Sequence, residues 1–261
     1  MSDATTNEPE VLYEVKEGAA WLTINREAKR NALSGETIAQ LQASLDRAAA
    51  DNAVRVICLT GAGKKSFCSG ADLTSMSGGD PVEAMRGYAN LLKALDVYPK
   101  PLVARVDGHC LAGGTGLLLS CDIAYARESV KFGTPELKVG LFPMMIGALI
   151  FRNVGRKKAL EMIYRGDKLT AAQAEDMGLI TRCYPDEDFD DAVAEALASI
   201  AAKAPVAARI GRQALAAIAD MPLNDALDLL CDKLGEVVAT EDAMEGLMAF
   251  MQKRKPDWKG R

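Results

Sequence analysis

Short apolar stretches recur through the first half of the chain and predict a series of β-strands. The first two stretches are separated by Glu17-Gly18, which favours a tight turn between paired strands. Residues 54–60 form a nearly continuous apolar run that ends at a glycine, a pattern typical of a buried strand. The expected strands are residues 12–15, 19–24, 54–60, 102–106, 123–126 and 130–132.

Helix signals alternate with these strands. Ser34 is a good N-cap for a helix that runs to about Ala50, and its apolar residues recur at helical spacing. A second helix is expected over residues 81–97, where Pro99 stops it. Residues 61–70 and 108–114 are rich in small residues and are predicted to be loops, followed by short helices. Repeated strand, loop and helix indicate an α/β fold.

The last third of the chain is expected to be mostly helical. Thr170 and Gln173 form a capping box at a helix start, and Gly178 follows as a stop signal. Thr240 is a further N-cap for the last helix. A change of pattern near residues 184–190 predicts a boundary between the core and a helical appendage.

Composition favours a globular protein. The chain has 261 residues, of which 49% are hydrophobic and 26% charged. The net charge of −5 argues against nucleic acid as a partner. The chain has no long apolar run and no apolar core near its start, so we expect neither a membrane span nor a signal peptide.

The six cysteines and the single histidine predict neither a metal site nor disulfides. No C-x-x-C pair occurs, so a metal would need ligands from unrelated segments. The cysteines are interpreted as reduced thiols in a cytoplasmic compartment. Cys68 and His109 could form a thiol and its base, but a buried structural cysteine and a backbone-bonded histidine are the favoured interpretations.

Common nucleotide and nucleophile motifs do not fit the sequence. Gly63-Lys64 lacks the first glycine and the Ser or Thr of a phosphate-binding loop. Ser66 stands where the third glycine of a dinucleotide-binding motif should be. No G-x-S-x-G occurs, so the serine nucleophile of an α/β-hydrolase is excluded.

Two segments of small residues carry the candidate chemistry. Residues 66–73 and 108–116 each follow a strand and place small residues where a helix should begin. Such residues let a ligand approach the backbone closely, and a helix start has unpaired N–H groups. Two such starts could direct two N–H donors at one oxygen, forming an oxyanion hole. Tight turns that only pack helices against strands are the alternative.

These segments resemble the enoyl-CoA hydratase/isomerase family, the crotonase superfamily. Residues 67–73 (FCSGADL) are similar to its F-C-A-G-A-D-L segment. Further resemblances follow in family order over nearly the whole chain: residues 25–33, 59–63, 111–122, 132–140, 171–179 and 246–254.

The resemblance implies a fold, a domain organisation and an assembly. The implied fold is an α/β, crotonase-like spiral of repeated ββα units with a helical C-terminal appendage. Residues 1–10 would be a flexible N-terminus, 11–188 the spiral core and 189–261 a helical trimerisation region. A homotrimer or a homohexamer of two trimers is expected. The partner would be an acyl-CoA thioester, whose coenzyme A is part of the substrate, so no separate cofactor is implied.

The resemblance also implies residue roles. Ala71 and Gly113 would donate the oxyanion N–H groups, and Glu136 would be the acid/base. The residues implied to contact coenzyme A are Lys29, Arg30, Ser69, Asp72, Leu73, Gly114, Phe250 and Lys253, the last two usually from a neighbouring subunit. We interpret Phe142, Met144 and Met145, with Met76, as an apolar acyl pocket, with core packing as the alternative.

One position departs from the family pattern. Gly116 stands where most hydratases carry a second glutamate. A hydration that uses two carboxylates is therefore in question, and three functions remain open. These are an enoyl-CoA hydratase or Δ3,Δ2-enoyl-CoA isomerase with Glu136 alone, another acyl-CoA reaction such as a hydratase-lyase or a decarboxylase, and a non-catalytic CoA-ester-binding protein.

Overall fold

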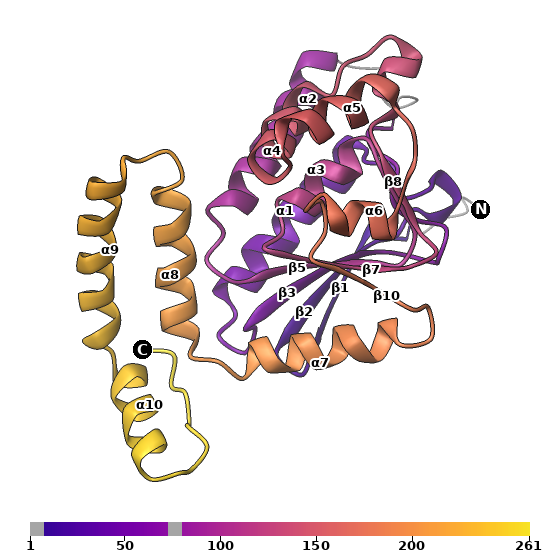
Figure 1. Cartoon of the computed structure of the whole chain (residues 1–261). Helices are drawn as coiled ribbons and strands as arrows, with labels where there is room; N and C mark the ends of the chain where they lie inside the picture. The colour runs from indigo at the N-terminus through magenta and orange to yellow at the C-terminus, as the bar shows by residue number, and fades with distance from the viewer. Residues whose placement is uncertain (1–7, 73–79) are drawn as a thin grey trace.

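The computed structural model describes residues 8–72 and 80–261 and shows two β-sheets, surrounding helices and a helical extension (Figure 1). Within these residues, one sheet has the strand order β1-β2-β3-β5-β7-β10 and the other has the order β4-β6-β8-β9. The strands of the larger sheet are β1 (Val11–Lys16), β2 (Ala19–Ile24), β3 (Val56–Gly61), β5 (Leu102–Val106), β7 (Ile123–Arg127) and β10 (Arg182–Tyr184). Those of the smaller sheet are β4 (Ser66–Cys68), β6 (His109–Leu111), β8 (Lys131–Gly133) and β9 (Leu169–Thr170).

The hairpin predicted at the start of the chain is confirmed. β1 and β2 pair antiparallel across Glu17 and Gly18, whose φ angles are +49° and +80°. Such positive angles suit the tight turns that match the twist of paired strands. The remaining strands of the larger sheet pair in parallel, as the alternation of strands and helices predicts.

The parallel strands belong to a repeated strand-strand-helix unit. A long strand of the larger sheet is followed by a short strand of the smaller sheet and then by a helix, as in β5-β6-α3. β4 and β6 lie in segments that the sequence analysis predicts to be loops, so that prediction is wrong there. Each has three residues, too few to show a hydrophobic period, and each forms because a neighbouring strand pairs with it.

The predicted helices begin where their caps indicate. Ser34 and Thr170 accept hydrogen bonds from the N–H groups of Thr37 and Gln173, respectively, in two capping boxes. The helices are α1 (Gly35–Ala50), α2 (Pro81–Asp96), α3 (Gly113–Leu119), α4 (Met144–Asn153), α5 (Arg156–Arg165), α6 (Ala171–Asp176), α7 (Phe189–Ala201), α8 (Pro205–Ala217), α9 (Leu223–Val238) and α10 (Glu241–Met251). Two 3₁₀ turns are η1 (Glu27–Lys29) and η3 (Pro135–Val139).

Both faces of the larger sheet are buried. Along β3, Ile57 and Leu59 join the main core on the side of α1 and α2, whereas Val56 and Cys58 pack against α7 on the other side (Figure 1). This two-sided burial explains why the sequence of β3 is continuously apolar.

The first helix of the predicted C-terminal region packs against the sheet. α7 buries Phe189, Val193 and Leu197, four residues apart, against the larger sheet. By its packing α7 is therefore part of the core, although the sequence analysis assigns it to the region 189–261. Only α8 to α10 extend away from the two sheets (Figure 1).

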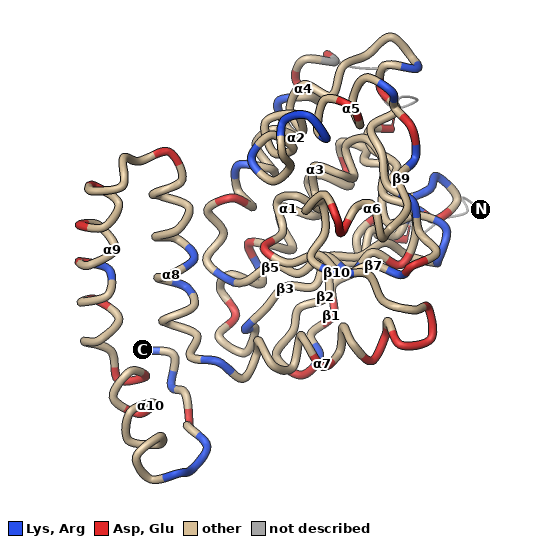
Figure 2. Tube along the Cα trace, viewed as in Figure 1, with Lys and Arg blue, Asp and Glu red and all other residues tan. Residues whose placement is uncertain are grey.

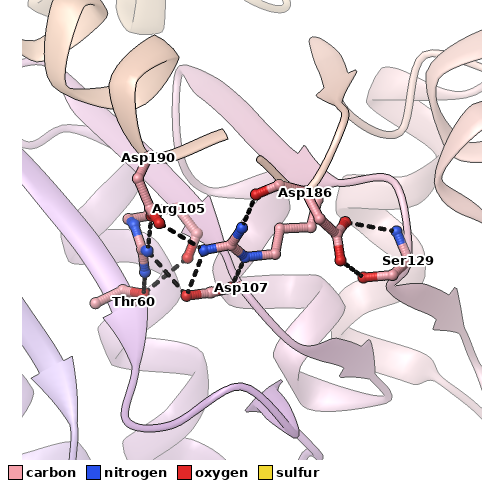
Figure 3. Close-up of polar contacts among 7 residues, drawn as sticks. Thr60, Arg105, Asp107, Ser129, Asp186 and Asp190 are labelled. Carbon is pink, nitrogen blue, oxygen red and sulfur yellow. Dashed lines mark hydrogen bonds and ion pairs between the residues drawn. The ribbon is translucent and has the colours of Figure 1, made fainter. Parts of the chain in front are cut away.

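An ion-pair network, buried at Asp107 and Arg127, fixes α7 to the carboxyl edge of the sheet (Figure 3). Asp107 pairs with Arg127, and it accepts a hydrogen bond from Arg105 at 2.8 Å. Asp190, on α7, pairs with the same two arginines, at 2.8 Å from Arg127. Both guanidinium groups also lie over the Phe189 ring, at 5.0 and 4.7 Å from its centroid. The network therefore joins β5, β7 and α7.

The helical extension exposes apolar side chains. On α9, acidic residues share the helix with Leu223, Leu227 and Leu234, which are 55–72% exposed (Figure 2). On α10, the most exposed apolar residue is Phe250, at 83%. Among the described residues, no helix combines the length and the apolar character needed to cross a bilayer.

Candidate active site

Three adjacent parallel strands end at the candidate site. β4 pairs with β6, and β6 pairs with β8, with Leu111 opposite Gly133. Carboxyl ends of parallel strands meet at one edge of a sheet, where ligands commonly bind. The residues just beyond these ends include Ala71, Gly113 and Glu136. The structure thus brings together the three predicted catalytic residues.

The Ala71 N–H points away from its neighbouring segment. Leu33 donates its N–H to Gly70 O at 2.8 Å, and Asp72 donates its N–H to Leu33 O at 2.9 Å. This parallel bridge uses the groups on either side of Ala71. Because backbone groups alternate in direction along an extended segment, the Ala71 N–H faces the opposite side. Ala71 itself is exposed, so a ligand can reach that N–H.

The Gly113 N–H lies at the start of α3, where N–H groups have no partner within the helix. The two donor residues are in close contact. A Cβ added to Gly70 would lie 2.9 Å from Gly113 N, and one added to Gly113 would lie 3.6 Å from Ala71 N. Two neighbouring N–H donors at the edge of the sheet can bind one carbonyl oxygen, as an oxyanion hole requires.

Ala112 holds a strained conformation just before Gly113. Its φ and ψ are +50° and −127°, a region that glycine occupies far more readily than alanine. We expect Ala112→Gly to raise the free energy of unfolding by about 1 kcal/mol, because relief of strain exceeds the entropy that glycine adds to the unfolded chain. Urea denaturation measures this change. A loss of stability would show that Ala112 is not strained.

Asp72 has its carboxylate in the protein interior. It is 6% exposed and accepts a hydrogen bond from Arg26 Nη2 at 2.8 Å. Arg26 Nε also pairs with Glu10 at 3.0 Å, and Glu10 accepts hydrogen bonds from Ser34 and Thr37 at 2.5 Å each. Arg26 thus joins Asp72 to Glu10, so the chain is held in place from Glu10, the last residue of the expected flexible terminus; residues 1–7 lie outside the described residues.

Glu136 follows β8 in the first turn of η3. Its Oε2 atom is buried and has no hydrogen-bond partner among the described residues. Burial raises the pKa of this carboxyl above its ordinary value of 4.5, and a backbone hydrogen bond opposes the shift. A half-buried carboxyl with a raised pKa and a free oxygen is suited to transfer protons.

Comparisons with known proteins identify the family of this chain. A family model described as enoyl-CoA hydratase/isomerase matches residues 14–261. The chain belongs to this family. The 2,3-dehydroadipyl-CoA hydratase of Escherichia coli is 34% identical over 97% of this chain and 99% of its own length. The short-chain-enoyl-CoA hydratase of Clostridium acetobutylicum is 31% identical over 94% of this chain and 95% of its own length.

The fold of the enoyl-CoA hydratase/isomerase family is confirmed as well. The crystal structure of an enoyl-CoA hydratase from Bacillus anthracis superposes with a TM-score of 0.92 at 30% identity, covering 97% of this chain and 100% of that chain. An enoyl-CoA hydratase from Mycobacterium smegmatis superposes with a TM-score of 0.91 at 31% identity, covering 96% of this chain and 99% of that chain. The predicted crotonase-like spiral of ββα units is therefore correct.

The residues that the family resemblance associates with coenzyme A differ in their exposure. Lys29 and Arg30 are exposed, and Arg30 has a left-handed φ of +54°. Ser69 is half-buried beside the donors. Gly114 is buried, and a Cβ added to it would lie 2.3 Å from Cys68 O, so only glycine fits at this position. Leu73 lies outside the described residues.

The residues predicted to form the acyl pocket follow Glu136 along the chain, and the Leu141 N–H donates to Glu136 O at 3.0 Å. Phe142 and Met144 are 40% and 73% exposed, and Met145 packs against the main core. Met76 lies outside the described residues. Phe250 and Lys253 lie on or just after α10, at the far end of the helical extension from α3 (Figure 1).

Cys68 and His109 do not form a reactive thiol and its base. Cys68 is fully buried, and burial raises the pKa of its thiol to about 12, with a hydrogen bond from the Gly70 N–H opposing the shift. His109 Nδ1 accepts a hydrogen bond from Lys131 N at 3.1 Å. These are the structural roles that the sequence analysis favours for both residues. In residues 8–72 and 80–261, no group of His, Cys, Asp or Glu is arranged to hold a metal ion.

Tyr88 is a site residue that the sequence analysis misses. It lies on α2, is 8% exposed, and donates its hydroxyl hydrogen to Gly113 O at 2.5 Å. Nothing in the pattern of residues 81–97 distinguishes it from a core aromatic residue. Only the tertiary structure, which brings α2 to the start of α3, places it beside Gly113.

Proposed function

We propose that this protein binds an acyl-CoA thioester, stabilises its enolate with the N–H groups of Ala71 and Gly113, and moves protons with Glu136. The observation that supports this proposal is that two neighbouring N–H groups and one half-buried carboxyl lie just beyond the ends of β4, β6 and β8. The match of the enoyl-CoA hydratase/isomerase family model to residues 14–261 supports an acyl-CoA thioester as the substrate.

The positions of these groups support enolate chemistry. A thioester carbonyl makes hydrogens on neighbouring carbon atoms acidic, and deprotonation moves negative charge onto the carbonyl oxygen. The two N–H groups stabilise that charge, and loss of one such donor typically costs about 2.7–4 kcal/mol. Glu136 accepts the proton and then returns it to carbon, and its raised pKa makes it a stronger base than an exposed glutamate.

Two reactions fit this apparatus. The names of the relatives favour hydration of an enoyl-CoA. The glycine at position 116 favours an isomerase, in which Glu136 alone carries a proton from one carbon of the acyl chain to another. A hydratase-lyase would use the same enolate and the same carboxyl.

Absorbance of the conjugated enoyl thioester separates these reactions. Purified protein is mixed with crotonyl-CoA and, separately, with a 3-enoyl-CoA. Loss of absorbance with crotonyl-CoA identifies a hydratase that needs one carboxylate. A gain with the 3-enoyl substrate alone identifies an isomerase. If the protein binds both esters but the absorbance of neither changes, the proposed reactions are contradicted.

We also propose that the helical extension forms a homotrimer or a hexamer of two trimers. Apolar side chains on α9 and α10, among them Leu223, Leu234 and Phe250, are more than half exposed, as is typical of a subunit interface. A neighbouring subunit could then bring Phe250 and Lys253 to the coenzyme A. Light scattering should give three or six times the mass of one chain, and a stable monomer would contradict this assembly.

The compartment and metabolic setting are proposals too. We propose that the protein acts in the cytoplasm, in fatty acid metabolism, and needs no cofactor beyond the coenzyme A of its substrate. The six cysteines are all free thiols, which fits a reducing compartment.

A further inference from the structure

The space in front of Gly116 is filled by a tyrosine. A Cβ added to Gly116 would lie 2.2 Å from Tyr88 Oη and 2.6 Å from Ile146 Cγ2. Both distances are far below a normal contact, and the nearer obstacle is a fully buried hydroxyl. The family position that often carries a second glutamate is therefore not merely lacking its carboxylate here, because a phenol from α2 occupies its place.

Tyr88 is fixed by a bond to the backbone of the site. Its hydroxyl donates to Gly113 O at 2.5 Å, and Gly113 is one of the two proposed oxyanion donors. Tyr88 Oη is also within van der Waals reach of Gly113, because a Cβ added there would lie 3.6 Å from it. The bond therefore limits rotation of the backbone at the start of α3.

The phenol stays neutral. Burial raises the pKa of Tyr88 well above 10, and the nearby thiols of Cys68 and Cys110 and the carboxyl of Glu136 raise it further. A neutral hydroxyl keeps its proton for the Gly113 carbonyl. It also adds no second negative charge near Glu136.

We propose that Tyr88 is a positioning residue that replaces the second carboxylate, holds the Gly113 backbone for enolate binding, and forms a compensating pair with Gly116. This inference rests on the proposed function. A side chain at position 116 and a tyrosine at position 88 exclude each other, so the pair commits the site to a reaction with Glu136 as its one carboxylate.

The positioning role is tested with Tyr88→Phe, which keeps the ring and removes the hydroxyl. Tyr98→Phe is a matched control, because Tyr98 is also buried and donates its hydroxyl to a backbone carbonyl, Leu45 O, at 2.8 Å. We expect Tyr88→Phe to lower kcat at least about tenfold with little change in KM, since a small misplacement of a catalytic group is costly. Tyr98→Phe should leave both constants unchanged.

A second measurement needs no turnover. Acetoacetyl-CoA is a β-keto thioester whose enolate absorbs in the near ultraviolet, so its bound absorbance reports on the oxyanion donors. Tyr88→Phe should reduce that absorbance, whereas Tyr98→Phe should not. Equal behaviour of the two variants, with activity still lost in Glu136→Gln, would overturn the positioning role and leave the proposed function intact. If the wild type neither turns over a substrate nor enolises this probe, both proposals fail.

The steric pair is tested by unfolding alone. Gly116→Ala should lower the urea midpoint strongly, because its Cβ meets Tyr88 Oη. In the Tyr88→Phe background the nearest ring atom, Cζ, would be 3.4 Å away, an ordinary contact, and the end of the Ile146 side chain can rotate aside. The double variant should therefore recover part of the lost stability. Additive losses would contradict the compensating pair.

Discussion

Replacing Glu136 with glutamine should reduce kcat at least about a hundredfold, because general acid–base catalysis contributes roughly 10² to 10⁴ in rate. Glutamine keeps the size of the side chain but cannot take up a proton. Binding of the acyl-CoA should survive, since the N–H groups of Ala71 and Gly113 belong to the backbone. Activity is followed by enoyl absorbance, and binding by calorimetry.

The matched control is Glu187→Gln, which changes an exposed glutamate in the turn before α7. It should retain wild-type kinetics. Full activity in Glu136→Gln would exclude Glu136 as the acid/base and leave the oxyanion donors without their proposed partner.

The same variant has an expected pH signature in stability. The folded pKa of Glu136 lies above its unfolded value of 4.5, so the native state loses stability as pH rises from the unfolded value through the folded one. Glutamine removes this loss. The free energy of unfolding of Glu136→Gln minus that of the wild type should therefore be larger at about pH 8 than at about pH 4. A difference independent of pH would show that burial of Glu136 does not perturb its ionisation.

Removing the carboxylate of Asp107 should lower the free energy of unfolding by about 3–5 kcal/mol, the usual effect of breaking a buried ion pair. Arg127 and Asp107 are only 6% and 7% exposed, and Arg105 shares the same carboxylate. Asp107→Ala leaves Arg127 Nε buried without its acceptor, which costs more than the attraction lost. Urea denaturation at a fixed protein concentration measures the change.

An exposed ion pair provides the comparison. Arg152 and Asp220 are 2.7 Å apart, with side chains 51% and 79% exposed. Asp220→Ala should change stability by less than about 1 kcal/mol, because water solvates both charges. Similar losses in Asp107→Ala and Asp220→Ala would show that the network in Figure 3 is not a significant source of stability.

The local structure of this protein follows closely from its sequence. Caps such as Ser34 and Thr170 act within four residues, so they locate helix starts without tertiary context. The continuous apolar run of β3 likewise reveals its burial on both faces. The family resemblance adds the three residues at the centre of the site, Ala71, Gly113 and Glu136, because each lies in a motif with a fixed local sequence.

Features that depend on contact between distant segments are decided only by the tertiary structure. β4 and β6 are too short to be recognised and form because they pair with each other. The sequence shows a glycine at position 116, but only the packing of α2 against α3 reveals that Tyr88 fills its place. Local patterns record how a segment interacts with itself and with water, whereas these contacts arise between side chains that become neighbours only when the chain folds.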